Sequence, residues 1–215
     1  MKRIKQTVLC AVLFGPMATA AFGQEWYFGA TGGYGLEPTF SVKQPAGSAS
    51  AGFDNGYAAG AFFGEEASNG WGGEVRYLYR QSNLKLESGG TSVHFAANTN
   101  ILNFDLLRHF GSRESSVQPF VAFGAGMKFL DGTGAQSASQ PLGAFAALTN
   151  TRESIPAGDV GFGVKTNFRR FWQFRAEVRD YIGPAPQKVI APTPPATLSG
   201  LQNDIIVSAS IAYCW

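Results

Sequence analysis

The sequence contains few cysteines, few histidines and no long apolar run beyond its first residues. Of its 215 residues, two are cysteine and two are histidine. Cys10 lies in an N-terminal targeting stretch, so only Cys214 remains in the mature chain, which excludes an intramolecular disulfide and a cysteine-based metal site. No later segment reaches the roughly 18 consecutive apolar residues of a membrane-spanning helix. That test is insensitive to membrane-spanning barrels, whose strands give a much weaker pattern.

The first 23 residues have the pattern of a secretory signal peptide. A basic start, MKRIK, precedes an apolar run from Thr7 to Ala21 and a small-residue end. This predicts cleavage after Gly23, with cleavage after Ala20 as the alternative. Cleavage after Gly23 removes three of the 17 basic residues and none of the 15 acidic ones, so the mature chain has a net charge near −1. We therefore expect an exported protein with one domain over residues 24–215 and no nucleic-acid partner.

Eight segments of the mature chain alternate between apolar residues and small or polar ones. Their period of two is that of the side chains of a β-strand. Their typical length is the roughly 9–11 residues that a tilted membrane-spanning strand needs. The segments are Glu25–Gly35, Gly56–Gly64, Trp71–Arg80, Val93–Phe110, Gln118–Leu130, Asp159–Phe168, Trp172–Tyr181 and Asp204–Trp215.

The connections between these segments alternate in length. The short ones are 65–70, 111–117 and 169–171, and the long ones, rich in Gly, Ser, Ala and Pro, are 36–55, 81–92, 131–158 and 183–203. Short turns at one end and long loops at the other are typical of outer membrane barrels. We therefore expect an all-β fold, an eight-stranded antiparallel up-and-down transmembrane β-barrel with short periplasmic turns and long extracellular loops. We expect the long loops to be mobile and solvated.

The stretch WGGEVRYLYR (71–80) shows which face lines the interior. Its two faces are Trp71, Gly73, Val75, Tyr77 and Tyr79, and Gly72, Glu74, Arg76, Leu78 and Arg80. A soluble barrel would turn the apolar face inward, whereas a membrane barrel turns it outward. An eight-stranded barrel has room inside only for side chains or one small ligand. The aromatic residues would overfill that space, so we expect the charged face to line the lumen.

The same argument assigns nine charged residues to the lumen. They are Glu74, Arg76, Arg80, Asp105, Lys128, Lys165, Arg175, Glu177 and Arg179. We expect a salt-bridge network among the six that lie nearest in height, namely Glu74, Arg76, Asp105, Lys165, Arg175 and Glu177. The network either fills the lumen or borders a narrow ion path, since rings of charge set selectivity. With six basic and three acidic groups, such a path would prefer anions.

The four tryptophans occupy the ends of predicted strands on the side of the short turns. They are Trp26, Trp71, Trp172 and Trp215. Tryptophan prefers the interface between membrane and water, where its ring is apolar and its N–H is hydrated. We therefore expect these four residues to be membrane-interface anchors on the periplasmic rim. Tyr34, Tyr57 and Tyr79 would form the opposite girdle.

Several stretches match a known family. They are WYFGATGGYG (26–35), QPFVAFGAGMKF (118–129), GFGVKTNF (161–168), FRAEVRDY (174–181) and IIVSASIAYCW (205–215). In these, the chain resembles the OmpA-type eight-stranded outer membrane β-barrel family (outer membrane protein beta-barrel domain) over essentially its whole mature length. Ile211, Tyr213 and Trp215 resemble the C-terminal signal that the barrel-assembly machinery reads, with Trp215 in place of the commoner Phe.

We expect a monomer in the cell outer membrane, surrounded by outer membrane lipids, with no cofactor and no metal. Its expected role is structural or that of a narrow porin-like pore. The alternative is surface adhesion or partner binding through the long loops. The apolar loop segment Leu142–Leu148 could contact lipid, the barrel mouth or a partner.

An enzyme acting on lipids is the least favoured interpretation. A serine hydrolase needs a histidine, a serine and a carboxylate close together. The serine is expected two residues after the histidine, but Ala96 stands at that position after His94. His109 lies beside a turn, so neither histidine matches this pattern. We predict no catalytic residue. We also expect the turn pairs Glu65-Glu66 and Arg169-Arg170 to be solvated.

Overall fold

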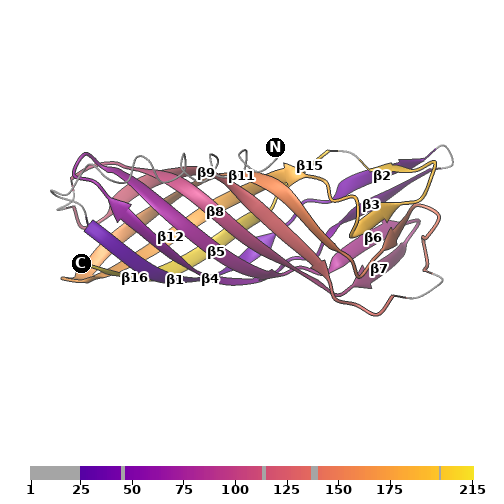
Figure 1. Ribbon diagram of the computed structural model, residues 1–215, viewed down its shortest axis with the longest axis horizontal. Coiled ribbons are helices and arrows are strands. Elements are labelled where there is room, and N and C mark those ends of the chain that lie inside the picture. The colour runs from indigo at the N-terminus through magenta and orange to yellow at the C-terminus, as the bar shows by residue number, and fades with distance from the viewer. Residues whose placement is uncertain (1–24, 45–46, 113–114, 137–139, 199) are drawn as a thin grey trace, which may run out of the picture.

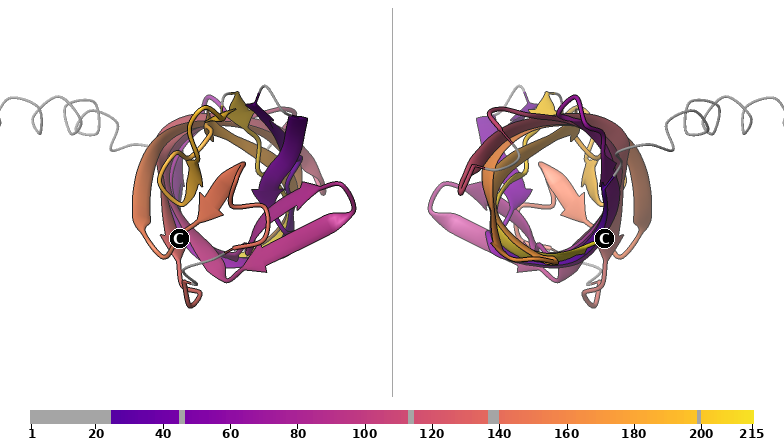
Figure 2. Two further views of the ribbon diagram at one scale, coloured as in Figure 1. Left: turned by 90° about the vertical axis from the view of Figure 1, so that its right-hand side faces the viewer. Right: turned by 90° about the vertical axis from the view of Figure 1, so that its left-hand side faces the viewer.

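The computed structural model describes residues 25–44, 47–112, 115–136, 140–198 and 200–215. The predicted signal peptide, residues 1–23, lies outside the described residues. Eight long strands form a closed antiparallel barrel (Figures 1 and 2). They are β1 (Glu25–Leu36), β4 (Gly56–Glu66), β5 (Trp71–Gln81), β8 (Ala97–His109), β9 (Gln118–Gly132), β11 (Arg152–Arg169), β12 (Trp172–Pro184) and β16 (Ile205–Cys214).

Each barrel strand pairs with the next one along the chain, and β1 pairs with β16 to close the ring. The three short connections lie at one end, which we call the turn end, and the long connections lie at the other, the loop end. The C-terminal residue, Trp215, also lies at the turn end, where its carbonyl accepts from the N–H of Trp26 at 3.1 Å. The predicted barrel topology is confirmed.

At the loop end, the wall continues into a smaller β-structure that we call the extension (Figure 1). Five strands form one sheet in the order β14-β2-β3-β6-β7, and two others pair separately. The five are β2 (Phe40–Gln44), β3 (Gly47–Phe53), β6 (Leu84–Ser88), β7 (Thr91–Phe95) and β14 (Thr197–Leu198). The two are β10 (Ala146–Leu148) and β13 (Ile190–Pro192), and β15 (Leu201–Gln202) pairs with the end of β12.

The extension differs from the solvated loops that we expected. In its strands too, apolar residues alternate with small or polar ones. Each strand therefore buries one face against a shared apolar core. The core comprises Val42, Ala49, Ala51, Phe53, Leu84, Leu86, Phe95, Ala97, Leu130, Ala146, Leu148, Ile155, Ala185, Val189, Ile190, Ala196 and Leu198. Leu142 and Phe145 pack against it. The apolar loop segment 142–148 therefore contacts the barrel mouth.

One predicted strand boundary is wrong. Val93 was assigned to the fourth barrel strand, but it lies in β7, and the barrel strand β8 begins at Ala97. The reason is the hairpin of β6 and β7, which pairs Leu86 with Val93 and draws this segment into the extension.

The outer face of the barrel is apolar around its whole circumference. On β8 and β11, for example, Phe104 is 60% exposed and Phe162 is 65% exposed. The outward residues of the extension sheet are instead small or charged, including Ser41, Ser48 and Lys85. Such an apolar band beneath a polar end is what a membrane-spanning barrel requires. Among the described residues, we find no helix of the length and apolar character needed to cross a membrane.

Candidate functional site

Charged side chains from four strands meet in one buried layer at the middle of the lumen. On β5, Nη2 of Arg76 donates to Oε1 of Glu74 at 2.7 Å, and Nη1 of Arg76 donates to Glu177 of β12. The other carboxylate oxygen of Glu74 accepts from Nη1 of Arg175 at 2.7 Å. Glu74 therefore bridges two guanidinium groups through charge-assisted hydrogen bonds, which are stronger than hydrogen bonds between neutral groups.

Arg179 extends this layer to the opposite wall. Its guanidinium lies 3.2 Å from Glu177 and 3.1 Å from Asp159, and it also donates to Asp105. The amide of Asn103 donates to the carboxylates of Asp105 and Asp159. We call the seven charged residues the central network: Glu74, Arg76, Asp105, Asp159, Arg175, Glu177 and Arg179.

The structure thus brings together five of the six residues predicted to form a network and adds two. Arg179 was placed on the inward face but left out of the six. Asp159 was overlooked because it stood at the end of a predicted strand, whereas β11 begins seven residues earlier, at Arg152. Its odd number places it on the same face as Gly161 and Lys165, which is the pattern that could have identified it.

Lys165 lies apart from the central network. Its ammonium donates to Glu66 near the turn end, and the ring of His109 lies 3.7 Å from the same carboxyl group. The interpretation of Glu66 as a solvated turn charge is therefore wrong, since its side chain points into the barrel and is buried. Arg169 and Arg170, at the turn between β11 and β12, are exposed, as expected.

Between these two charged groups, aromatic rings fill the lumen. The guanidinium of Arg175 lies 4.3 Å from the ring centre of Tyr27 and 4.8 Å from that of Phe62. Both rings are buried, and Phe120 lies on the same guanidinium at 5.8 Å. These cation–π contacts hold the arginine in place and occupy the cross-section of the lumen.

A second charged layer lies at the loop end, above an apolar layer formed by Ala58, Leu78, Ile101, Tyr181 and Ile206. Here, Nη1 of Arg80 contacts Glu37 at 2.7 Å and Asp204 at 2.6 Å. Lys128 lies 3.8 Å from Asp204 and donates to the carbonyl of Tyr181 at 3.1 Å. On β9, Leu130 of the extension core follows two residues after Lys128, so the core begins directly beyond this layer.

The interior charges are nearly balanced. Among the described residues, the buried basic side chains of the barrel are Arg76, Arg80, Lys128, Lys165, Arg175 and Arg179. The buried acidic ones are Glu37, Glu66, Glu74, Asp105, Asp159, Glu177 and Asp204, together with Glu153 at the start of β11, which accepts from backbone N–H groups of the extension. The predicted excess of positive charge is therefore wrong. Of the acids absent from the predicted set, Glu37 and Glu66 had been assigned to a loop and a turn, whereas Asp159 and Asp204 stood at the ends of predicted strands.

The four tryptophans all lie at the turn end. Trp26 stacks on Phe63 at 5.3 Å, and Trp172 meets Tyr213 edge to face at 5.5 Å. Trp215 stacks on Tyr213 at 6.0 Å. Trp71 lies under the guanidinium of Arg108 at 5.3 Å. Ile211 also faces outward on β16, so the three C-terminal residues of the predicted assembly signal share one external face.

The extension holds a further group of polar residues that sequence reasoning missed. The hydroxyl of Ser92 lies 2.9 Å from Nε2 of His94, and Nδ1 of His94 lies 2.8 Å from Oδ2 of Asp54. The expected pattern places the serine two residues after the histidine, whereas Ser92 stands two residues before His94. Asp54 is 40 residues away and meets His94 only through the pairing of β3, β6 and β7.

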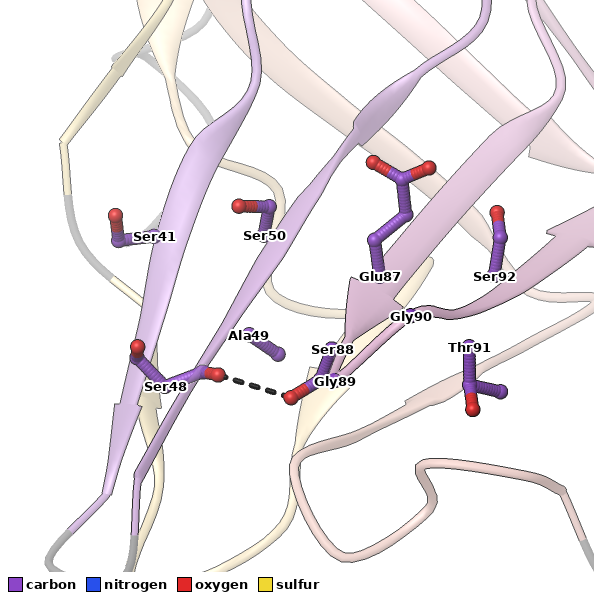
Figure 3. A pocket seen from close by; sticks show the side chains of 10 residues that line it. All are labelled: Ser41, Ser48, Ala49, Ser50, Glu87, Ser88, Gly89, Gly90, Thr91 and Ser92. Carbon is purple, nitrogen blue, oxygen red and sulfur yellow. Dashed lines mark hydrogen bonds between the residues drawn. The ribbon is translucent and has the colours of Figure 1, made fainter.

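Beside Ser92, the extension sheet carries a cleft of about 490 Å³ (Figure 3). Its lining residues are Ser41, Ser48, Ala49, Ser50, Glu87, Ser88, Gly89, Gly90, Thr91 and Ser92. The half-buried Glu87 pairs with Lys85 at 2.9 Å, and this pairing lowers the pKa of the Glu87 carboxyl. The cleft is therefore lined by hydroxyl groups and one carboxylate.

Comparison with known proteins agrees with this architecture. A family described as "Outer membrane protein beta-barrel domain" matches residues 7–185. Neisserial surface protein A (NspA) has a similar structure, with a TM-score of 0.54 and 12% identity over 87% of this chain and 96% of that one. The outer membrane protein OprG of Pseudomonas aeruginosa has a TM-score of 0.53 and 14% identity over 90% and 96%. At such identities the likeness establishes the fold. No curated protein matches the chain.

Proposed function

Because the chain belongs to the outer membrane protein beta-barrel domain family, we propose that it is a structural, non-conducting barrel that anchors a folded extension outside the cell. The proposal includes export by a cleaved signal peptide and insertion as a monomer through recognition of Ile211, Tyr213 and Trp215 by the barrel-assembly machinery. Outer membrane lipids would surround the apolar band, and the four tryptophans would anchor its periplasmic rim.

The layered filling of the lumen is the observation that carries this proposal. An ion crossing the barrel would have to pass the aromatic rings around Arg175, the central network, the apolar layer and the Arg80 layer. Arg76, Arg80, Arg175 and Arg179 are among the most deeply buried side chains of the protein. Displacing any of them would separate buried charges, at about 3–5 kcal/mol for each broken pair.

Single-channel recording in planar bilayers tests the proposal. We expect the wild-type protein to give no conductance above that of the bilayer. Arg175→Ala is the comparison variant, because it removes the side chain that holds the aromatic rings and Glu74 together, and we expect brief openings from it. Well-resolved, sustained steps from the wild-type protein would favour the narrow pore over the structural barrel.

Surface binding through the extension is a second candidate function. The polar outward face of the sheet favours it, since this face carries the cleft above the apolar band. Cells expressing the wild-type protein would be compared with cells expressing a barrel in which short turns replace residues 37–55 and 82–96. Equal attachment to matrix-coated surfaces would exclude this role.

A further inference from the structure

Ser92, His94 and Asp54 have the connectivity of the catalytic triad of a serine hydrolase. The two imidazole nitrogens have different partners: Nε2 faces the hydroxyl at 2.9 Å and Nδ1 faces the carboxylate at 2.8 Å. In a triad, the nitrogen facing the hydroxyl takes its proton, and the carboxylate holds the other N–H. A carboxylate can only accept, so it fixes the tautomer in which Nδ1 carries the proton and Nε2 is free.

The local fold holds these three groups in place. Ser92 and His94 are two residues apart on β7 and therefore lie on one face of the sheet. A two-residue turn at Gly89 and Gly90, with φ of +56° and +80°, fixes the register of the hairpin, and these positive angles favour glycine. The N–H of Asp54 donates to the carbonyl of Asn83 at 2.7 Å, which fixes the carboxylate beside the hairpin.

The same hairpin directs the N–H of Ser92 away from β6. Ser88 and Thr91 flank the two-residue turn and form the hydrogen-bonded pair that closes it. In an antiparallel ladder the next pair, Glu87 and Ser92, is a non-hydrogen-bonded one, so its N–H groups point outward. Since β7 is the last strand of the sheet, the N–H of Ser92 lies at an open edge, where it can donate to a developing oxyanion.

Ser92 also borders the cleft, which gives a substrate a place to lie. The pairing of the strands places Ser41, Ser50, Glu87 and Ser92 in one row across β2, β3, β6 and β7, and Figure 3 shows their side chains along one side of the sheet. Hydroxyl and carboxylate groups at this spacing suit a ligand that carries several hydroxyl groups. The lining contains no large apolar side chain that would hold a long acyl chain.

We propose that this site hydrolyses short-chain acyl esters of polyhydroxylated compounds on the extracellular side. The Ser92 oxygen attacks the ester carbonyl carbon while its proton passes to Nε2 of His94. The carbon–oxygen bond to the polyol then breaks, and His94 returns the proton to the departing alcohol. Water attacks the acyl–Ser92 ester next, giving its proton to His94. The free acid leaves as the Ser92 oxygen recovers that proton, so water is the only co-reactant.

The test uses the full barrel in detergent micelles with two chromogenic esters, p-nitrophenyl acetate and p-nitrophenyl palmitate. We expect hydrolysis of the acetate to exceed that of the palmitate. Ser92→Ala and His94→Gln should each lower the acetate rate by about 10²–10⁴-fold, the usual contribution of such groups. The matched control is Ser68→Ala, which removes an exposed serine at the turn end and should leave the rate unchanged.

A fluorophosphonate probe followed by mass spectrometry locates the nucleophile independently of the rate. We expect an adduct on Ser92 that His94→Gln strongly reduces. Heat-modifiable gel migration of every variant confirms that the barrel is closed. An unchanged acetate rate in Ser92→Ala, an adduct on a different residue, or faster hydrolysis of the palmitate would each overturn the proposal.

Discussion

Replacing Arg179 by methionine is expected to destabilise the barrel far more than replacing its partner Asp159 by asparagine. The central network sets three arginines against four carboxylates. Arg179→Met leaves two arginines facing four buried carboxylates, and we expect a loss of about 3–5 kcal/mol. Asp159→Asn instead leaves three of each. It costs one hydrogen bond, from Asn103 or Arg179, for which we expect about 1 kcal/mol.

The two substitutions are also expected to be coupled. In the double variant Arg179→Met/Asp159→Asn, one of the uncompensated carboxylates is gone, so the loss should be smaller than the sum of the single losses. Urea unfolding in detergent micelles measures all three values, with tryptophan fluorescence and heat-modifiable gel migration as probes. Equal losses for the two single variants, or strict additivity in the double variant, would refute the view that charge balance governs the stability of this layer.

Three further predictions concern other parts of the molecule. Leu84→Ala in the extension core should cost about 2–5 kcal/mol and expose the extension to added protease while gel migration of the barrel stays unchanged. Phe104→Arg on the outer face should cost about 2–4 kcal/mol in lipid vesicles, whereas Ser68→Arg at an exposed turn should cost about 0.5 kcal/mol or less. Trp215→Ala should lower the fraction of protein assembled in the outer membrane several-fold, measured by gel migration of membrane fractions, and equal assembly would remove Trp215 from the assembly signal.

The barrel could be predicted from the sequence because the period of two is strong on every strand. In WGGEVRYLYR, the size of the aromatic residues alone decides that Glu74 and Arg76 face inward, and both are buried. Pairings between side chains across the lumen were harder to predict from the sequence. Lys165 and Glu66 meet over 99 residues of sequence, and their common height depends on the stagger of strands that a single sequence does not reveal.

The extension was missed for a different physical reason. Segments such as Gly47–Phe53 consist mostly of small residues, whose strand propensity is low, and only pairing with β2 and β6 stabilises them as strands. The approach of Asp54 to His94 depends on the same pairings. Composition indicated flexible loops there, whereas the tertiary contacts produce a sheet with its own core.

Strand β11 crosses from one solvent to another without changing the direction of its side chains. Near its start, Ile155 and Ala157 are buried while Arg152 is exposed, as in a water-soluble sheet. Beyond Gly158, the buried positions hold Asp159 and Lys165, and the exposed ones are apolar. Shifting the barrel along the membrane normal by the length of two strand residues would place polar groups in lipid or aromatic rings in water. The change of pattern along β11 therefore sets the depth of the barrel in the membrane and how far the extension projects from it.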